Sequence, residues 1–310
     1  MRLFKRAKKK DGWLAVAIGR DGVAITSIQR APDAKPLVRF AQFLPGNSGV
    51  ETIEKAGRDG QAGVRHCTTL LRGGDYQILN VEAPNVPRDE MKTAVRWRLK
   101  DILDFPAAEA TIDVLDIALD ANSRAQQSVF VIAAKNSIIA PRQKLFLDAK
   151  VELTAIDIPE MAQRNVSAML EPEGRGIAML SFGDDGGLLT VSYRGELYLS
   201  RRFEVTLAQL LEPDHDRKHA SFDKITLELQ RSLDHFERQY SFISVAKLIL
   251  GPSPVVGLDE YLSSNLYTPV ETLNLASLFD LARTPELADL GQQQRFFLAL
   301  GAALRDGEGA

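Results

Sequence analysis

The sequence contains one cysteine, Cys67, among 310 residues. A single thiol excludes an intramolecular disulfide framework and a metal site made of several cysteines, and it is consistent with a reducing compartment. We expect Cys67 to be a small core residue. An excess of charge of one sign is also lacking, since the formal net charge is −3 at pH 7. Without an overall basic field to attract phosphates, the chain is not expected to bind nucleic acid.

Long hydrophobic runs are absent too, and no stretch approaches the roughly 20 apolar residues that cross a bilayer. The chain begins MRLFKRAKKK, which is basic like the start of a signal peptide, but Asp11 and Gly12 stand where an apolar core would follow. We therefore expect a chain that is neither exported nor membrane-spanning. This tail is either a solvated terminus or a contact for anionic lipid. The candidate lipid-contact residues are Arg2, Phe4, Lys5 and Arg6.

The sequence does contain two copies of one strand pattern. Its composition, with 45% apolar and 25% charged residues, supports two lobes that each have a core. In the first copy, strands at Trp13–Ile18 and Val23–Gln29 flank the tight turn Gly19-Arg20-Asp21-Gly22, because Asp-Gly between apolar runs is typical of a hairpin. A third strand, a helix and a closing strand are then predicted at Leu37–Phe43, Val50–Arg72 and Tyr76–Val81.

The second copy repeats that order, offset by about 163 residues at its hairpin and about 170 at its closing strand. Its strands are predicted at Ile177–Phe182, Leu188–Tyr193, Glu196–Phe203 and Ala246–Leu250. Its helix is predicted over about residues 222–240. The side chains that share the apolar face of this helix are Ile225, Leu229, Leu233 and Phe236. Two β-β-β-α-β halves make a two-lobed α/β protein with a cleft between the lobes, an arrangement that resembles the actin, hexokinase and Hsp70 superfamily.

In that superfamily, each hairpin turn directs glycines and an aspartate at nucleotide phosphates, the aspartate orienting a magnesium-bound water. Here the turns read Ala17-Ile18-Gly19 and Ser181-Phe182-Gly183, so each keeps the glycine and lacks the aspartate. The third signature, a glycine-rich turn beside adenosine, is replaced by Leu250-Gly251-Pro252-Ser253-Pro254, whose prolines donate no N–H.

These departures predict degenerate nucleotide loops, no ATP hydrolysis and only residual binding of ATP with magnesium. The residues concerned are Ala17, Gly19, Ser181, Gly183 and Gly251. Alternatively, the glycines serve only as turn residues.

An inserted segment, Pro84–Ala134, opens with a helix between Pro87 and Pro106. Its buried stripe is predicted at Met91, Val95, Leu99 and Ile102. Trp97 projects from nearly the opposite side. With Arg96 it is a candidate for partner binding, because aromatic and arginine side chains anchor interfaces. The alternative is that Trp97 packs on a neighbouring lobe.

This segment resembles the type IV pilus assembly protein PilM and, within that family, the MSHA-type protein MshI. The resemblance rests on Pro87-Arg88-Asp89-Glu90, Arg96-Trp97 and Phe105-Pro106, followed by the acidic strand Asp113-Val114-Leu115-Asp116. Further matching stretches are Val129–Lys135 with the helix to Ala149, Ala155-Ile156-Asp157-Ile158-Pro159, Arg231-Ser232-Leu233 and Leu298–Arg305. PilM keeps the aspartates of its phosphate turns, so their loss here favours the MshI branch and argues against inherited ATP binding.

The resemblance implies a cytoplasmic assembly protein, peripheral at the inner face of the inner membrane. It would grip the cytoplasmic tail of a PilN-like (MshJ-like) single-span membrane protein between the first lobe and the inserted subdomain. Contacts with the pilus assembly platform and its motor ATPase, and a homo-oligomer, belong to the same expectation. The alternative is an actin-like ATPase that controls recruitment by its nucleotide state. We expect a PilM-like role over that of the related secretion protein GspL, which continues into a membrane span where this sequence has polar residues 305–310.

Other enzyme classes have little support. An ATPase or sugar kinase needs a phosphate-turn aspartate, and a kinase also needs an aspartate base. A metal enzyme would use His215 and His219, but Pro213 and the dense charge around them indicate a solvated loop, so no metal site is expected. The segments predicted are a basic tail (1–12), a lobe-one core (13–83), the inserted subdomain (84–134), a return to lobe one (135–158), lobe two (159–291) and a C-terminal helix and tail (292–310).

Overall fold

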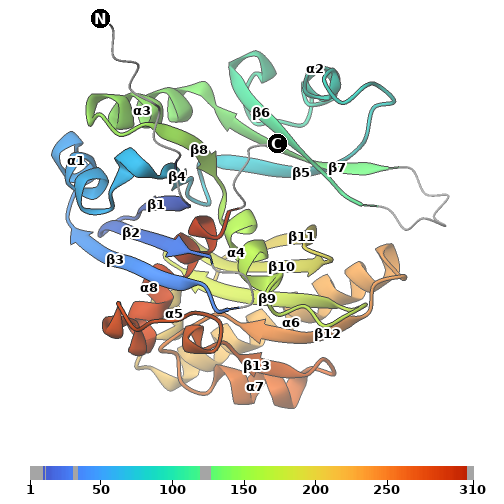
Figure 1. The fold of residues 1–310 in the computed structure, drawn as a ribbon. Helices are drawn as coiled ribbons and strands as arrows, with labels where there is room; N and C mark the ends of the chain where they lie inside the picture. Colours follow the sequence, from blue (N-terminus) through green and yellow to red (C-terminus); the bar gives the residue numbers. More distant parts are fainter. Residues whose placement is uncertain (1–9, 11, 31–33, 119–126, 306–310) are drawn as a thin grey trace, which may run out of the picture.

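Three β-sheets organise the chain, which a computed structural model describes for residues 10, 12–30, 34–118 and 127–305 (Figure 1). The lobe-one sheet has the order β3-β2-β1-β4-β8. Its strands are β1 (Trp13–Ile18), β2 (Gly22–Gln29), β3 (Leu37–Pro45), β4 (His66–Leu70) and β8 (Leu153–Asp157). β1 is antiparallel to β2 and parallel to β4.

Side chains of the lobe-one sheet alternate between two buried faces, as the pleat of a strand requires. Leu14 faces the helices α1 (Val50–Asp59) and α3 (Asn136–Asp148), where it packs in one core with the fully buried Phe146. Ala15 belongs to a different core, shared with the C-terminal helix. Cys67 is fully buried as expected, and burial raises the pKa of its thiol to about 12.

Lobe two repeats the sheet order as β11-β10-β9-β12-β13. Its strands are β9 (Gly176–Gly183), β10 (Gly186–Tyr193), β11 (Glu196–Phe203), β12 (Val245–Leu250) and β13 (Val270–Thr272). Its helices are α5 (Leu207–Leu210), α6 (His215–Gln239) and α7 (Leu258–Asn265). The predicted apolar face of α6 is confirmed, since Ile225, Leu229, Leu233 and Phe236 are all buried.

Two helices, α4 (Pro159–Ser167) and α8 (Leu290–Ala303), lie between the lobes and share a core with both sheets. They approach so closely that a Cβ at Gly301 would stand 2.2 Å from the carbonyl oxygen of Ala162. Short 3-10 segments complete the chain at Ala62–Val64, Ala107–Glu109, Leu275–Ser277 and Pro285–Ala288. The two lobes are therefore joined by a continuous apolar contact as well as by the chain.

The third sheet extends from lobe one in the order β5-β7-β6, with α2 (Met91–Arg98) packed on it. Its strands are β5 (Tyr76–Glu82), β6 (Ala110–Asp116) and β7 (Ser128–Lys135). Val95 and Leu99 of the predicted helical stripe are fully buried in its core. The matching strand orders of the two lobes confirm the expected two-lobed, actin-like α/β fold.

Two predictions in the first half are wrong. The helix predicted over Val50–Arg72 ends at Asp59, because glycines interrupt the pattern and Gln61 takes a left-handed backbone conformation at φ 58°. The β-branched run within 66–70 then forms β4, which is the true closing strand of the first repeat. The strand predicted for that role, Tyr76–Val81, lies in β5, which pairs instead with β7 in the third sheet.

Two further predictions need correction. The segment around His215 and His219 is not a loop, because α6 begins at His215, where the Asp214 side chain accepts a hydrogen bond from the Arg217 N–H. Ile102 is 49% exposed, because α2 has ended before it and helical spacing no longer applies.

The N-terminal lipid-contact candidates Arg2, Phe4, Lys5 and Arg6 lie outside the described residues. In the part of the chain that the structure describes, none of the helices combines the length and the apolar character that a bilayer crossing requires.

Candidate functional site

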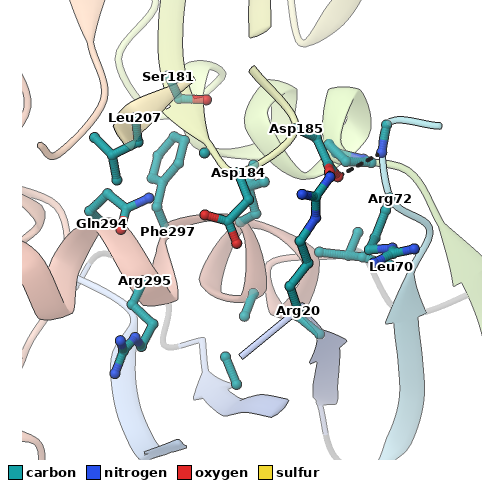
Figure 2. Close-up of a pocket in the computed structure, with 18 of the residues that line it drawn as sticks. Arg20, Leu70, Arg72, Ser181, Asp184, Asp185, Leu207, Gln294, Arg295 and Phe297 are labelled. Carbon is teal, nitrogen blue, oxygen red and sulfur yellow. Dashed lines mark hydrogen bonds and ion pairs between the residues drawn. The ribbon is translucent and has the colours of Figure 1, made fainter. Parts of the chain in front are cut away.

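A cavity of about 350 Å³ lies between the lobes, at the position of the cleft that the sequence predicts (Figure 2). Its walls are the β1–β2 turn of lobe one, the β9–β10 turn of lobe two, the last residue of β4 with residues 71–73 that follow it, and α8. Of the predicted loop residues, Ala17, Gly19, Ser181 and Gly183 line it. The fold thus brings together two turns that are far apart in the sequence.

The lobe-one turn is held by its own backbone and by α8. The Gly19 N–H donates to the Gly22 carbonyl at 2.8 Å. Asp21 pairs with Arg295 of α8 at 3.4 Å, and the Arg295 guanidinium also lies 4.0 Å from the centre of the Phe43 ring. The carboxylate that follows Gly19 is therefore engaged within the protein, and the methyl group of Ala17 carries no metal ligand.

The lobe-two turn uses Ser181 for internal bonding. This side chain is buried, and its hydroxyl donates to Oε1 of the fully buried Gln163 at 2.6 Å. The Gln163 amide in turn donates to the carbonyls of Met179 and Leu188. Because Ser181 is satisfied by α4, its hydroxyl holds the turn to the core and is not directed at a ligand.

Gly251, directly after β12, supports the same turn, since its N–H donates to the Leu180 carbonyl at 2.8 Å. A Cβ at this position would stand 3.0 Å from the Cβ of Ser181. Close packing thus accounts for glycine here, and the neighbouring Pro252 lines the cavity where the superfamily has further glycines.

Polar contacts cross the mouth of the cleft. Arg20 of the first turn extends to Asp185 of the second, with 3.0 Å between its Nη2 and Oδ1. The second oxygen of Asp185 accepts the backbone N–H of Gly73 at 3.2 Å. Figure 2 shows the neighbouring Asp184 carboxylate pointing into the cavity.

A buried polar cluster adjoins the cleft through Arg202, which lines the cavity. Glu160 of α4 is fully buried and accepts hydrogen bonds from Arg202 at 2.8 Å and from the Tyr76 hydroxyl. Arg202 also donates to the Tyr76 oxygen at 2.6 Å. Burial, and then the adjacent Glu160 carboxylate, raise the pKa of Tyr76 well above its usual range. The cluster joins α4, lobe two and the third sheet.

The partner-binding candidates on α2 differ from each other. Trp97 is 66% exposed, with the Lys100 ammonium 3.6 Å from the ring centre, so it does not pack on a neighbouring lobe. The Arg96 guanidinium donates to the carbonyls of Ala107 and Ala110. Arg96 therefore ties α2 to the start of β6, a structural role that the sequence did not reveal.

A second hollow, the α3–β8 groove, was not anticipated from the sequence. It has a volume of about 630 Å³, and its walls are α3 and the outer edge strand β8. Most of its lining is apolar: the lining residues are Gln143, Lys144, Leu147, Val151, Glu152, Leu153, Thr154, Ala155 and Ile156. Leu147 is 75% exposed. The only local signal for this groove is an apolar residue directly after the buried Phe146.

No protein-family model matches this sequence, and no curated protein matches it. Solved structures do. One is a PilM–PilN type IV pilus biogenesis complex, with a TM-score of 0.76 at 21% identity over 95% of this chain and 98% of that chain. Another is the cytoplasmic domain of EpsL, an inner membrane component of the type II secretion system of Vibrio cholerae, with a TM-score of 0.50 at 12% identity over 93% and 94%. At these identities the likeness is one of fold, shared over at least 93% of this chain.

Proposed function

We propose that this chain is an assembly protein of a type IV pilus platform and that it binds the cytoplasmic tail of a PilN-like single-span membrane protein in the α3–β8 groove. The observation that carries the proposal is an apolar groove that runs along a free sheet edge. β8 pairs with β4 on one side, and among the described residues no strand pairs with its other side. The fold's likeness to a PilM–PilN complex supports the choice of partner.

An edge strand beside an apolar groove suits an extended peptide. The peptide's backbone can pair with the unpaired groups of β8, while its apolar side chains enter the groove. Such burial must offset the entropy that a tail loses on binding. Leu147, Leu153 and Ile156 provide apolar surface for this purpose.

The groove's position agrees with a site at the junction of lobe one and the inserted subdomain. The N-terminal half of α3 packs against the third sheet, where Ile139 shares a core with Ala134 of β7. The C-terminal half packs on lobe one through Phe146. A tail bound beside α3 would therefore touch the element that joins the two parts.

The finer assignments belong to the same proposal. The chain acts in the cytoplasm at the inner face of the inner membrane, in an MSHA-type system with an MshJ-like partner. It contacts the assembly platform and its motor ATPase, and homo-oligomers form there. Catalysis plays no part, because Ala17 and Ser181 replace the metal-orienting aspartates and Asp21 and Asp185 are paired within the protein. The remaining turn carboxylate, Asp184, lines the cavity but lies three residues after Ser181 and does not occupy its position.

The test is fluorescence anisotropy with a labelled peptide that carries the cytoplasmic tail of a PilN-like protein. Leu147→Glu places a carboxylate in the groove, and we expect tail affinity to fall by about tenfold or more, because the charge loses water on binding. The matched control is Leu227→Glu on α6, where the leucine is 46% exposed in lobe two. Equal affinity for both variants would overturn the proposal.

Two further arms of this titration separate the alternatives. Trp97→Ala removes the exposed aromatic of α2, and a loss there with none at Leu147 would place the tail on α2. Arg96 is unsuitable for this comparison, because its substitution also removes the bonds to Ala107 and Ala110. Repeating the titration with ATP and magnesium should leave the affinity unchanged. A shift would favour the alternative in which nucleotide state controls recruitment.

A further inference from the structure

The contacts of Asp185 have the form of a bound oxyanion. Each of its two carboxylate oxygens accepts one hydrogen bond from lobe one, Oδ1 from Arg20 and Oδ2 from the Gly73 N–H. A side-chain cation with a backbone N–H is also the donor set that proteins present to phosphate groups. Here the anion they hold is part of the other lobe.

The surroundings of Asp185 are arranged for close approach. A Cβ at Gly73 would stand 2.5 Å from Nη1 of Arg202 and 3.3 Å from the Cβ of Asp185. A side chain at position 73 would have to displace the Arg202 guanidinium, and glycine lets residues 70–73 pass close to both side chains without that shift. Arg20 and the Gly73 N–H thus both reach the Asp185 carboxylate, and the Arg202 guanidinium lies beside Gly73.

The ion pairs in and beside the cleft distinguish Asp185 from the other carboxylates there. Arg295 pairs with Asp21, and Arg202 pairs with Glu160. Asp184 also lines the cavity, but no hydrogen bond or ion pair reaches it from the described residues, whereas its neighbour Asp185 has two donors. The donors thus select one of two adjacent carboxylates by position.

We propose that Asp185 is an internal ligand that fills an oxyanion site at the mouth of the cleft, and that a phosphate-bearing ligand can enter only by displacing it. The site consists of Arg20 and the Gly73 N–H, and the ligand class that it excludes is the polyphosphates. In this arrangement the Asp185 carboxylate of lobe two joins the two lobes by binding Arg20 and the Gly73 N–H of lobe one. This inference concerns the cleft and does not depend on tail binding in the α3–β8 groove.

The test is calorimetric titration with pyrophosphate at constant ionic strength. Asp185→Ala vacates the site, and we expect it to bind pyrophosphate about tenfold tighter than the unsubstituted protein, since two charge-assisted donors become available. The matched control is Asp184→Ala, which removes the same charge one residue away without freeing a donor. We expect its affinity to change by less than about threefold.

A second substitution tests the donor. Adding Arg20→Gln to Asp185→Ala should abolish most of the gain, because the cation that would hold the phosphate is gone. Asp185→Asn, which keeps the side chain's size, should give an intermediate gain and serves as the variant if Asp185→Ala does not fold. Equal gains in the Asp185 and Asp184 variants would mean that only net charge matters, and no gain in a folded Asp185 variant would mean that no oxyanion site exists. Either result overturns the proposal, whereas tail affinity should be unaffected throughout.

Discussion

The interlobe cleft and the α3–β8 groove are both hollows, but the protein fills them differently. In and beside the cleft, charged side chains pair with each other, as Arg20 of lobe one does with Asp185 of lobe two, and Arg202 of lobe two with Glu160 of α4. In the groove, apolar side chains and a sheet edge face solvent without a partner strand among the described residues. Most charged groups of the cleft are thus bonded within the protein, whereas the apolar surface and the sheet edge of the groove are accessible to a partner. Loss of stability should follow substitutions in the cleft, and loss of partner binding should follow substitutions in the groove.

The largest loss of stability is expected from a substitution at Glu160. Glu160→Ala leaves Arg202, 29% exposed at its side chain, without its carboxylate next to a buried tyrosine. Removing one partner of a buried pair costs about 3 kcal/mol or more of the free energy of unfolding. Denaturant titration measures this cost.

The control for Glu160 is the same substitution at an exposed pair. Glu204→Ala removes a carboxylate that is 89% exposed and lies 3.0 Å from Lys224. A surface pair contributes about 0 to 1 kcal/mol, so this variant should unfold close to the unsubstituted protein. Similar losses in both variants would show that the cleft cluster is not a special contributor to stability.

The parts of the fold that could be predicted from the sequence are those that depend on local patterns. The hairpins of both lobes follow from local turn chemistry and alternation, and they are confirmed at nearly the expected residues. β4 was missed because it is a short strand in a segment that reads as helical. The pairing of β5 with β7 was missed because strand partners far apart in the chain leave no local pattern.

The candidate sites divide in the same way. The two turns could be located because their glycines stand at fixed places in a repeat, and both line the cavity. The ion pair that joins the two turns could not be predicted, because Arg20 and Asp185 are 165 residues apart and the sequence around each gives no sign of the other. The α3–β8 groove was missed for a similar reason, because an exposed leucine on a helix has meaning only once the neighbouring strand is known to be an edge.

A smaller effect is expected at Tyr76, whose hydroxyl bonds to Glu160 and Arg202. Tyr76→Phe should cost about 1.5 kcal/mol, as for hydrogen bonds to charged groups. The matched control, Tyr267→Phe, removes a fully exposed hydroxyl and should cost nothing measurable.

The pH dependence gives a second reading of Tyr76. Its pKa is raised in the folded protein, so the folded state keeps the proton at a pH where the unfolded tyrosine, with a pKa of about 10, has lost it. The stabilisation that Tyr76 gives to the folded state is therefore complete below about pH 10 and declines as the pH rises further. Unfolding at pH 9 and pH 10.5 should show a smaller decline for Tyr76→Phe than for the unsubstituted protein. An equal decline would place the titrating groups elsewhere.

The smallest effect on stability is expected in the groove. Leu147→Glu should change the free energy of unfolding by no more than about 0.5 kcal/mol, because a side chain that is 75% exposed loses little packing. Its neighbour on α3 is the control, since Phe146→Ala removes a fully buried ring and should cost about 3 to 5 kcal/mol. If Leu147→Glu instead destabilised the protein nearly as much as Phe146→Ala, Leu147 would belong to the core. A loss of tail affinity in that variant would then result from unfolding and not from the loss of a binding contact.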